Sequence, residues 1–140
     1  MISVIIGTHG RFSEEILKSA EMIFGVQESV GIVTFKPGEG LDNLLEKYDE
    51  LISELDCTDG VLFMVDLFGG SPFNAASIIA MKNDNMEIVT GVNLPMILET
   101  LGSRDFSSLS ELLVIAENSG KEAIRVLNKN IKTETEDEII

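Results

Sequence analysis

The sequence predicts an α/β fold with an open, mainly parallel β-sheet, helices on both faces, and the doubly wound, flavodoxin-like strand order. Two observations predict it. Short apolar runs bounded by turn residues alternate along the chain with segments in which apolar residues recur every three or four positions. The run at residues 61–65 is apolar throughout, which is typical of a strand whose two faces are both covered by helices.

Four apolar runs are the expected strands, because each is short and ends close to a turn residue or a charged residue. They are residues 2–6, 31–35, 61–65 and 87–90. Five segments with a helical period are the expected helices. They are residues 12–24, 41–55, 72–81, 95–101 and 109–127. Ser71 is the expected N-cap of the third helix, since its hydroxyl can accept from free amides and Pro72 suits the first helical position.

The 140 residues are expected to form one domain at 1–133 with an acidic tail at 134–140, since no repeat, linker or change in composition divides them. A net charge of −14 with ten Lys and Arg residues argues against a nucleic-acid partner, which needs clustered basic residues. The single cysteine, Cys57, allows no internal disulfide and fits a reducing compartment. No run reaches the roughly 20 apolar residues that span a bilayer, so we expect a soluble protein.

His9, the single histidine, follows the first expected strand in the sequence Gly-Thr-His-Gly at residues 7–10. A lone histidine is more often a surface or core residue than a functional one. Here the position after a strand and between glycines favours function, because the sites of parallel sheets gather at the carboxyl ends of the strands.

Asp66 follows the third expected strand, which neighbours the first in flavodoxin-like order, so its carboxylate is expected beside His9. An aspartate bonded to one ring nitrogen fixes the tautomer and leaves the other nitrogen free as a nucleophile. The turn formed by Gly69, Gly70 and Ser71 can then point amides at an anion. The alternatives are an aspartate that only caps a turn and a turn that only joins strand to helix.

Three segments resemble, in this order, the IIA component of bacterial sugar phosphotransferase systems of the mannose family. They are residues 6–10, residues 60–66 with 69–76, and residues 91–96. The similarity covers about residues 1–127. It implies that His9 is the phosphorylated residue, that Asp66 is its hydrogen-bonded partner, and that the turn at 69–71 binds the phosphoryl group.

The resemblance further implies that Thr8, Asn93 and Pro95 line the site and that neither a metal nor another cofactor is needed. The phosphoryl group would arrive from the phosphocarrier protein HPr and leave to a histidine of a IIB component in a separate chain. Membrane components IIC and IID would be only indirect partners. The family is cytoplasmic and homodimeric with an exchanged C-terminal strand, so residues 129–133 are either that strand or part of the tail.

Other functions in the same fold class fit the sequence less well. A receiver domain phosphorylated on Asp66 needs acidic metal ligands after the first strand, where this chain has Thr8 and His9. A nucleotide-binding module needs GxGxxG or a Walker lysine pattern after a strand, and a histidine phosphatase needs a second histidine. Phe68 and Phe73 are either partner contacts or anchors of the turn. The sequence identifies neither the sugar nor the IIB acceptor.

Overall fold

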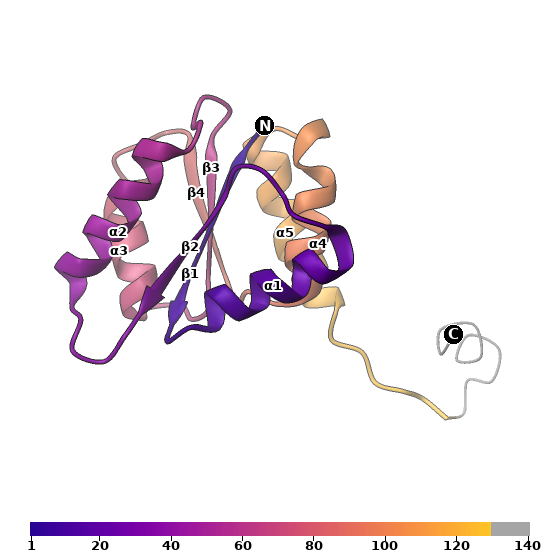
Figure 1. The fold of residues 1–140 in the computed structure, drawn as a ribbon. Coiled ribbons are helices and arrows are strands. Elements are labelled where there is room, and N and C mark those ends of the chain that lie inside the picture. Colours follow the sequence, from indigo (N-terminus) through magenta and orange to yellow (C-terminus); the bar gives the residue numbers. More distant parts are fainter. Residues whose placement is uncertain (130–140) are drawn as a thin grey trace.

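A four-stranded parallel sheet lies between two layers of helices in the computed structural model, which describes residues 1–129 (Figure 1). The strand order is β2-β1-β3-β4, so the first and third strands are neighbours and the predicted fold class is confirmed. The strands are β1 (Ser3–His9), β2 (Val30–Phe35), β3 (Val61–Val65) and β4 (Met86–Thr90). The helices are α1 (Phe12–Phe24), α2 (Leu41–Glu54), α3 (Ser71–Ala80), α4 (Leu94–Ser103), the 3-10 turn η1 (Arg104–Phe106) and α5 (Leu109–Glu122).

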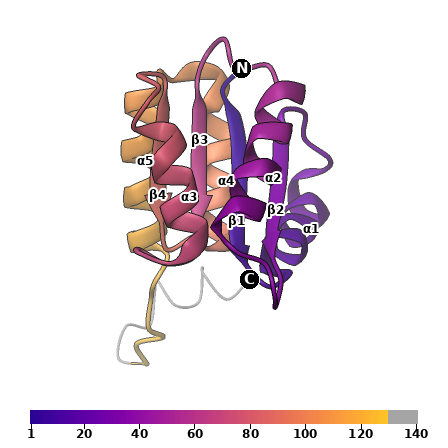
Figure 2. The same cartoon turned by 90° about the vertical axis from the view of Figure 1, so that its left-hand side faces the viewer.

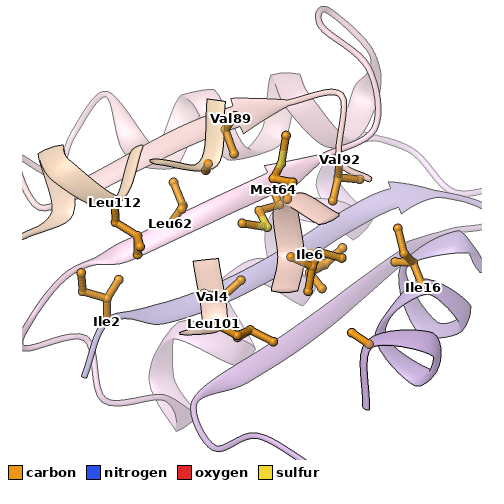
Figure 3. Close-up of a cluster of buried hydrophobic side chains, with 14 residues drawn as sticks. Ile2, Val4, Ile6, Ile16, Leu62, Met64, Val89, Val92, Leu101 and Leu112 are labelled. Atoms are coloured by element: carbon orange, nitrogen blue, oxygen red, sulfur yellow. The ribbon is translucent and has the colours of Figure 1, made fainter. Parts of the chain in front are cut away.

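Different helices bury the two faces of the sheet, because side chains alternate along each strand. Val4 and Ile6 of β1 pack with Leu62 of β3 under α1, α4 and α5 (Figure 3). Ile5 belongs to the core on the other face, under α2 and α3, which Figure 2 shows in front of the sheet. His9 lies four residues after Ile5 on β1, and every second strand residue points to the same face. Its side chain therefore points to the α2 and α3 side.

The first strand continues further than predicted. The apolar run ends before Gly7, but β1 extends to His9, which pairs with Phe35 of β2. Gly10 adds one more bridge, donating its N–H to the Phe35 carbonyl at 2.7 Å. Strand pairing depends on backbone groups rather than apolar side chains, which is why the apolar pattern underestimates its length. His9 is therefore a strand residue held in register, and not part of a loop.

The last helix is shorter than the predicted segment at 109–127, since α5 ends at Glu122. Ile124 and Val126, which follow, are 84% and 89% exposed. They bury too little apolar surface to extend the helix, because tertiary packing supplies most of a helix's stability. Residues 130–140, which hold most of the predicted exchanged strand and the predicted acidic tail, lie outside the described residues.

A buried arginine holds the edge of the sheet opposite His9. Arg104 is 2% exposed, and its guanidinium donates to the carbonyls of Ile2, Glu28 and Ser29 at the start of β1 and β2. Burial lowers the pKa of Arg104. A buried cation is tolerated only with such hydrogen bonds, so Arg104 acts as a clamp between the two strand starts.

Candidate functional site

His9 and Asp66 lie in direct contact at the carboxyl edge of the sheet, where β1 and β3 end side by side. Nδ1 of the imidazole is 2.9 Å from Oδ2 of Asp66, and the same oxygen accepts the backbone N–H of His9 at 3.1 Å. The other carboxylate oxygen accepts the N–H of Leu67 at 3.1 Å. The predicted adjacency of the two side chains is thus confirmed, and the carboxylate is fixed by two amides.

The hydrogen bond to Asp66 determines which ring nitrogen of His9 is available. A carboxylate can only accept, so Nδ1 is the donor and carries the proton. In the neutral imidazole, Nε2 is then left with its lone pair. The His9 side chain is 44% exposed and that of Asp66 only 17%, so solvent or a partner reaches the imidazole while the carboxylate is shielded. Phe35 contacts the imidazole edge-on, with ring centroids 5.7 Å apart.

The turn after Asp66 approaches the imidazole closely, and glycines make this possible. Gly69 has a φ of +84°, which L side chains rarely adopt. A Cβ atom at Gly70 would lie 2.8 Å from Cε1 of His9 and 3.6 Å from Nε2, so only glycine allows the backbone to pack against the ring. The start of α3 is thereby placed beside Cε1 and Nε2 of the imidazole.

Helix α3 begins differently from the prediction. Its N-cap is Gly70 and not Ser71, and no side chain caps it. Ser71 is the first helical residue and Pro72 lies in the first turn. The amides at the start of a helix have no partner within the helix, and its dipole favours an anion there. The amides of Ser71 and Phe73 therefore belong to a helix start that suits a phosphate group.

The side chains of three residues expected to line the site make contacts that support the fold. The Thr8 hydroxyl is buried, accepts the N–H of Ser13 at 2.7 Å and so supports the start of α1. Asn93 caps α4 by accepting the N–H of Met96 at 3.0 Å, and its amide group donates to the Gly120 carbonyl. Pro95 lines a hollow between α4 and α5. The Thr8 hydroxyl also donates to the His9 carbonyl at 3.1 Å, and the lining role of the three residues stays a prediction.

A groove of about 500 Å³ lies next to the turn, along the outer edge of β4. Phe68 and Phe73, whose ring centroids are 4.6 Å apart, form its end near the turn. Leu113 and Ile124 line it from the α5 side. Phe73 packs against the core under α2 and α3, whereas Phe68 contacts its ring and is 80% exposed.

The part of the chain that the structure describes, residues 1–129, has no cluster of three His, Cys, Asp or Glu side chains that could hold a metal ion. None of its helices has the length and apolar character needed to cross a bilayer.

The family and the fold are shown by similarity to known proteins. A family model described as the PTS system fructose IIA component matches residues 3–117. The chain belongs to the mannose-type EIIA family. The match includes His9, Asp66 and the turn at 69–71, so the whole site described above lies within the EIIA domain.

Relatives of this EIIA chain include proteins from several bacteria. It is 49% identical over 127 residues to the mannose-specific EIIAB component of Escherichia coli K12, which covers 90% of this chain but 39% of that protein. It is 37% identical over 132 residues to the fructose-specific EIIA component of Bacillus subtilis, covering 94% and 90%. The chain thus spans about two fifths of the E. coli relative and nearly all of the B. subtilis one.

Solved structures of EIIA proteins share the fold. The mannose/sorbose-specific IIA subunit of Enterococcus faecalis superposes with a TM-score of 0.84 at 28% identity, covering 94% of this chain and 98% of that one. The EIIA component of Streptococcus agalactiae gives a TM-score of 0.83 at 30% identity, covering 90% and 97%. The arrangement of strands and helices is therefore that of the family.

Gly70→Ala tests the close approach of the turn to the imidazole. The φ of Gly70 is −77°, which alanine adopts freely, so the added Cβ acts mainly by pushing against the His9 ring. We expect the ¹H–¹⁵N signals of the imidazole to shift, with a loss of at most about 1 to 3 kcal/mol in the free energy of unfolding.

Gly102→Ala is the matched control, because a Cβ there meets its nearest atom, in Phe24, at 3.4 Å. It should leave the imidazole signals unchanged. Identical His9 signals in Gly70→Ala and the parent protein would show that the turn does not press on the ring.

Proposed function

We propose that this chain is a phosphoryl relay of a sugar phosphotransferase system, which accepts a phosphoryl group on Nε2 of His9 and passes it to a histidine of another component. The observation that carries the proposal is the hydrogen bond between Nδ1 of His9 and Oδ2 of Asp66, which leaves Nε2 as the nucleophile beside a helix start. Membership of the EIIA family supports it.

In the proposed reaction, the lone pair of Nε2 attacks the phosphorus of a donor phosphohistidine in line. The bond from Nε2 to phosphorus forms while the bond from phosphorus to the donor nitrogen breaks, and that electron pair returns to the donor ring. The proton stays on Nδ1 of His9, so the phosphorylated ring becomes positively charged. Asp66, 2.9 Å away, stabilises that charge. Donor and acceptor are the same chemical group, so the reverse and onward steps follow the same path.

The turn at 69–71 is proposed to bind the phosphoryl oxygens. Charge develops on the three equatorial oxygens during transfer, and fixed hydrogen-bond donors stabilise it best. The support is the close contact of Gly70 with the His9 ring and the helix start that follows it. The amides of the turn and the Ser71 hydroxyl are the proposed donors.

HPr is the proposed donor and a IIB component the proposed acceptor, with IIC and IID as indirect membrane partners and the cytoplasm as the location. In-line transfer between two imidazoles requires both protein surfaces to meet around His9. Leu67 and Phe68, 57% and 80% exposed in the turn after Asp66, and Phe12, 46% exposed at the start of α1, are then placed to contact the partner. We assign these three residues to a partner-contact rim.

A homodimer is proposed as the assembled form. β4 lies at one end of the sheet order, and the groove of about 500 Å³ runs along its outer edge. An unpaired strand edge is a template for another strand. Residues 129–133 of a second copy are the proposed occupant, since that segment follows α5, whose Leu113 and Lys121 line the groove.

Phosphorylation by purified phosphorylated HPr tests the relay. His9→Ala should abolish labelling. Asp66→Asn should slow labelling by a factor on the order of 10² to 10⁴, because the carboxamide that replaces the carboxylate can donate to Nδ1 and so favours the wrong tautomer. The rate is measured by rapid quench with radiolabelled phosphate, and Asp59→Asn, at the opposite end of the sheet, is the control.

Stoichiometric labelling of His9→Ala would contradict the relay. A phosphoprotein that survives acid but not base would instead indicate an acyl phosphate, as expected for a receiver domain phosphorylated on Asp66.

Truncation after Leu127 tests the proposed dimer. The full chain should sediment as a dimer in analytical ultracentrifugation and the truncated chain as a monomer, because the segment proposed to fill the groove is gone. Truncation after Thr133 removes only the acidic tail and should preserve the dimer. A dimer that survives the shorter truncation would show that a different surface joins the subunits.

A further inference from the structure

Tyr48 places a hydroxyl group in the core directly beneath the candidate site. It lies on α2, its side chain is fully buried, and its ring packs edge-on against Phe63 of β3 with centroids 5.3 Å apart. The hydroxyl donates to the carbonyl of Pro72 at 3.0 Å. Pro72 is in the first turn of α3, next to Ser71. One side chain of α2 is thus tied to the helix start that borders His9.

The same hydroxyl lies against β1. A Cβ atom at Gly7 would be 2.0 Å from the Tyr48 oxygen and 2.9 Å from Cζ, so the phenol end occupies the space of a side chain at position 7. Residues two apart on a strand point to the same face at a spacing of about 7 Å. Gly7 and His9 are two apart, so the hydroxyl lies one step below the imidazole, on the same face.

The N-cap residue of α3 contributes no side-chain hydrogen bond, which is also true of the N-cap residues of α1 and α2. Asn93 caps α4 and Ser108 caps α5 through their side chains, whereas the N-cap of α3 is Gly70, which has none to offer. Burial, and secondarily the charge of Asp66, raises the pKa of Tyr48, so its hydroxyl remains a donor at physiological pH. The bond to the Pro72 carbonyl therefore persists.

Core packing alone does not explain a hydroxyl at this position. A phenylalanine would fill the same apolar space, and a buried hydroxyl is costly without a partner. The partner here is a carbonyl of α3 rather than of α2 itself. The contact therefore fixes one element relative to another.

We infer that Tyr48 is a positioning residue: its hydroxyl fixes the start of α3 relative to β1 and so sets the distance between the turn at 69–71 and Nε2 of His9. The inference rests on the proposed phosphoryl relay and adds to it a residue that touches neither the phosphoryl group nor the imidazole. A turn held at the wrong distance would still admit the donor protein but would stabilise the transferring phosphoryl group less well.

Tyr48→Phe tests this inference, because it keeps the ring and removes only the hydroxyl. With phosphorylated HPr as donor, the rate constant at saturating donor should fall about tenfold, and KM should change less than about twofold. The amide ¹H–¹⁵N signals of Gly70 and Ser71 should shift in the unphosphorylated protein.

Ser3→Ala is the matched control. The Ser3 side chain is also fully buried on β1 and donates to a backbone carbonyl, that of Asp56, at the far end of the strand. Ser3→Ala should lower the melting temperature about as much as Tyr48→Phe does, without changing the transfer rate or the amide signals of the turn.

The outcomes distinguish a failure of the proposed function from a failure of the inference on Tyr48 alone. A parent protein that phosphorylated HPr does not label would overturn the proposed function and this inference with it. A labelled parent protein whose rate and turn signals are the same in Tyr48→Phe would overturn the inference alone. Equal losses of rate in Tyr48→Phe and Ser3→Ala would also overturn it, because the effect would then be one of general stability.

Discussion

The site depends on a single hydrogen bond, in which the Asp66 carboxylate accepts from Nδ1 of His9. The bond sets the tautomer of the ring, and so decides which nitrogen can react. Two backbone amides, those of His9 and Leu67, hold the carboxylate in place before any partner arrives. The strand order is what makes the bond available, because it places the ends of β1 and β3 next to each other. The strand order therefore places the imidazole and the carboxylate in contact.

Close packing around this bond relies on positions without side chains. Gly70 leaves room for the His9 ring against the turn, and Gly7 leaves room for the Tyr48 hydroxyl against β1. Both contacts bring backbone within reach of a functional group, and neither tolerates a Cβ without movement of a neighbour. The site is thus built as two layers on the same face of the sheet: the imidazole with its carboxylate above, and the phenol that braces the start of α3 below.

Much of the site could be predicted from the sequence, because the rule that parallel strands share one functional edge is strong. Given β1 and β3 as neighbours, the meeting of His9 and Asp66 follows. The extension of β1 to His9 could not be read from apolar residues, since backbone pairing with β2 continues it. The early end of α5 and the hydrogen bonds from Arg104 to three carbonyls could not be predicted either. Both depend on which groups, distant in the sequence, lie close together in space. Ser71 has the residue type of an N-cap, but the geometry at Gly70 displaces it by one position.

The most direct test of the account is ¹⁵N NMR of the His9 imidazole before and after phosphorylation. If Asp66 holds Nδ1, the neutral imidazole of the free protein will show a proton on Nδ1 and an unprotonated Nε2. After reaction, phosphorus coupling will then appear on Nε2. A proton on Nε2 in the neutral free ring, or phosphorus coupled to Nδ1, would contradict the account.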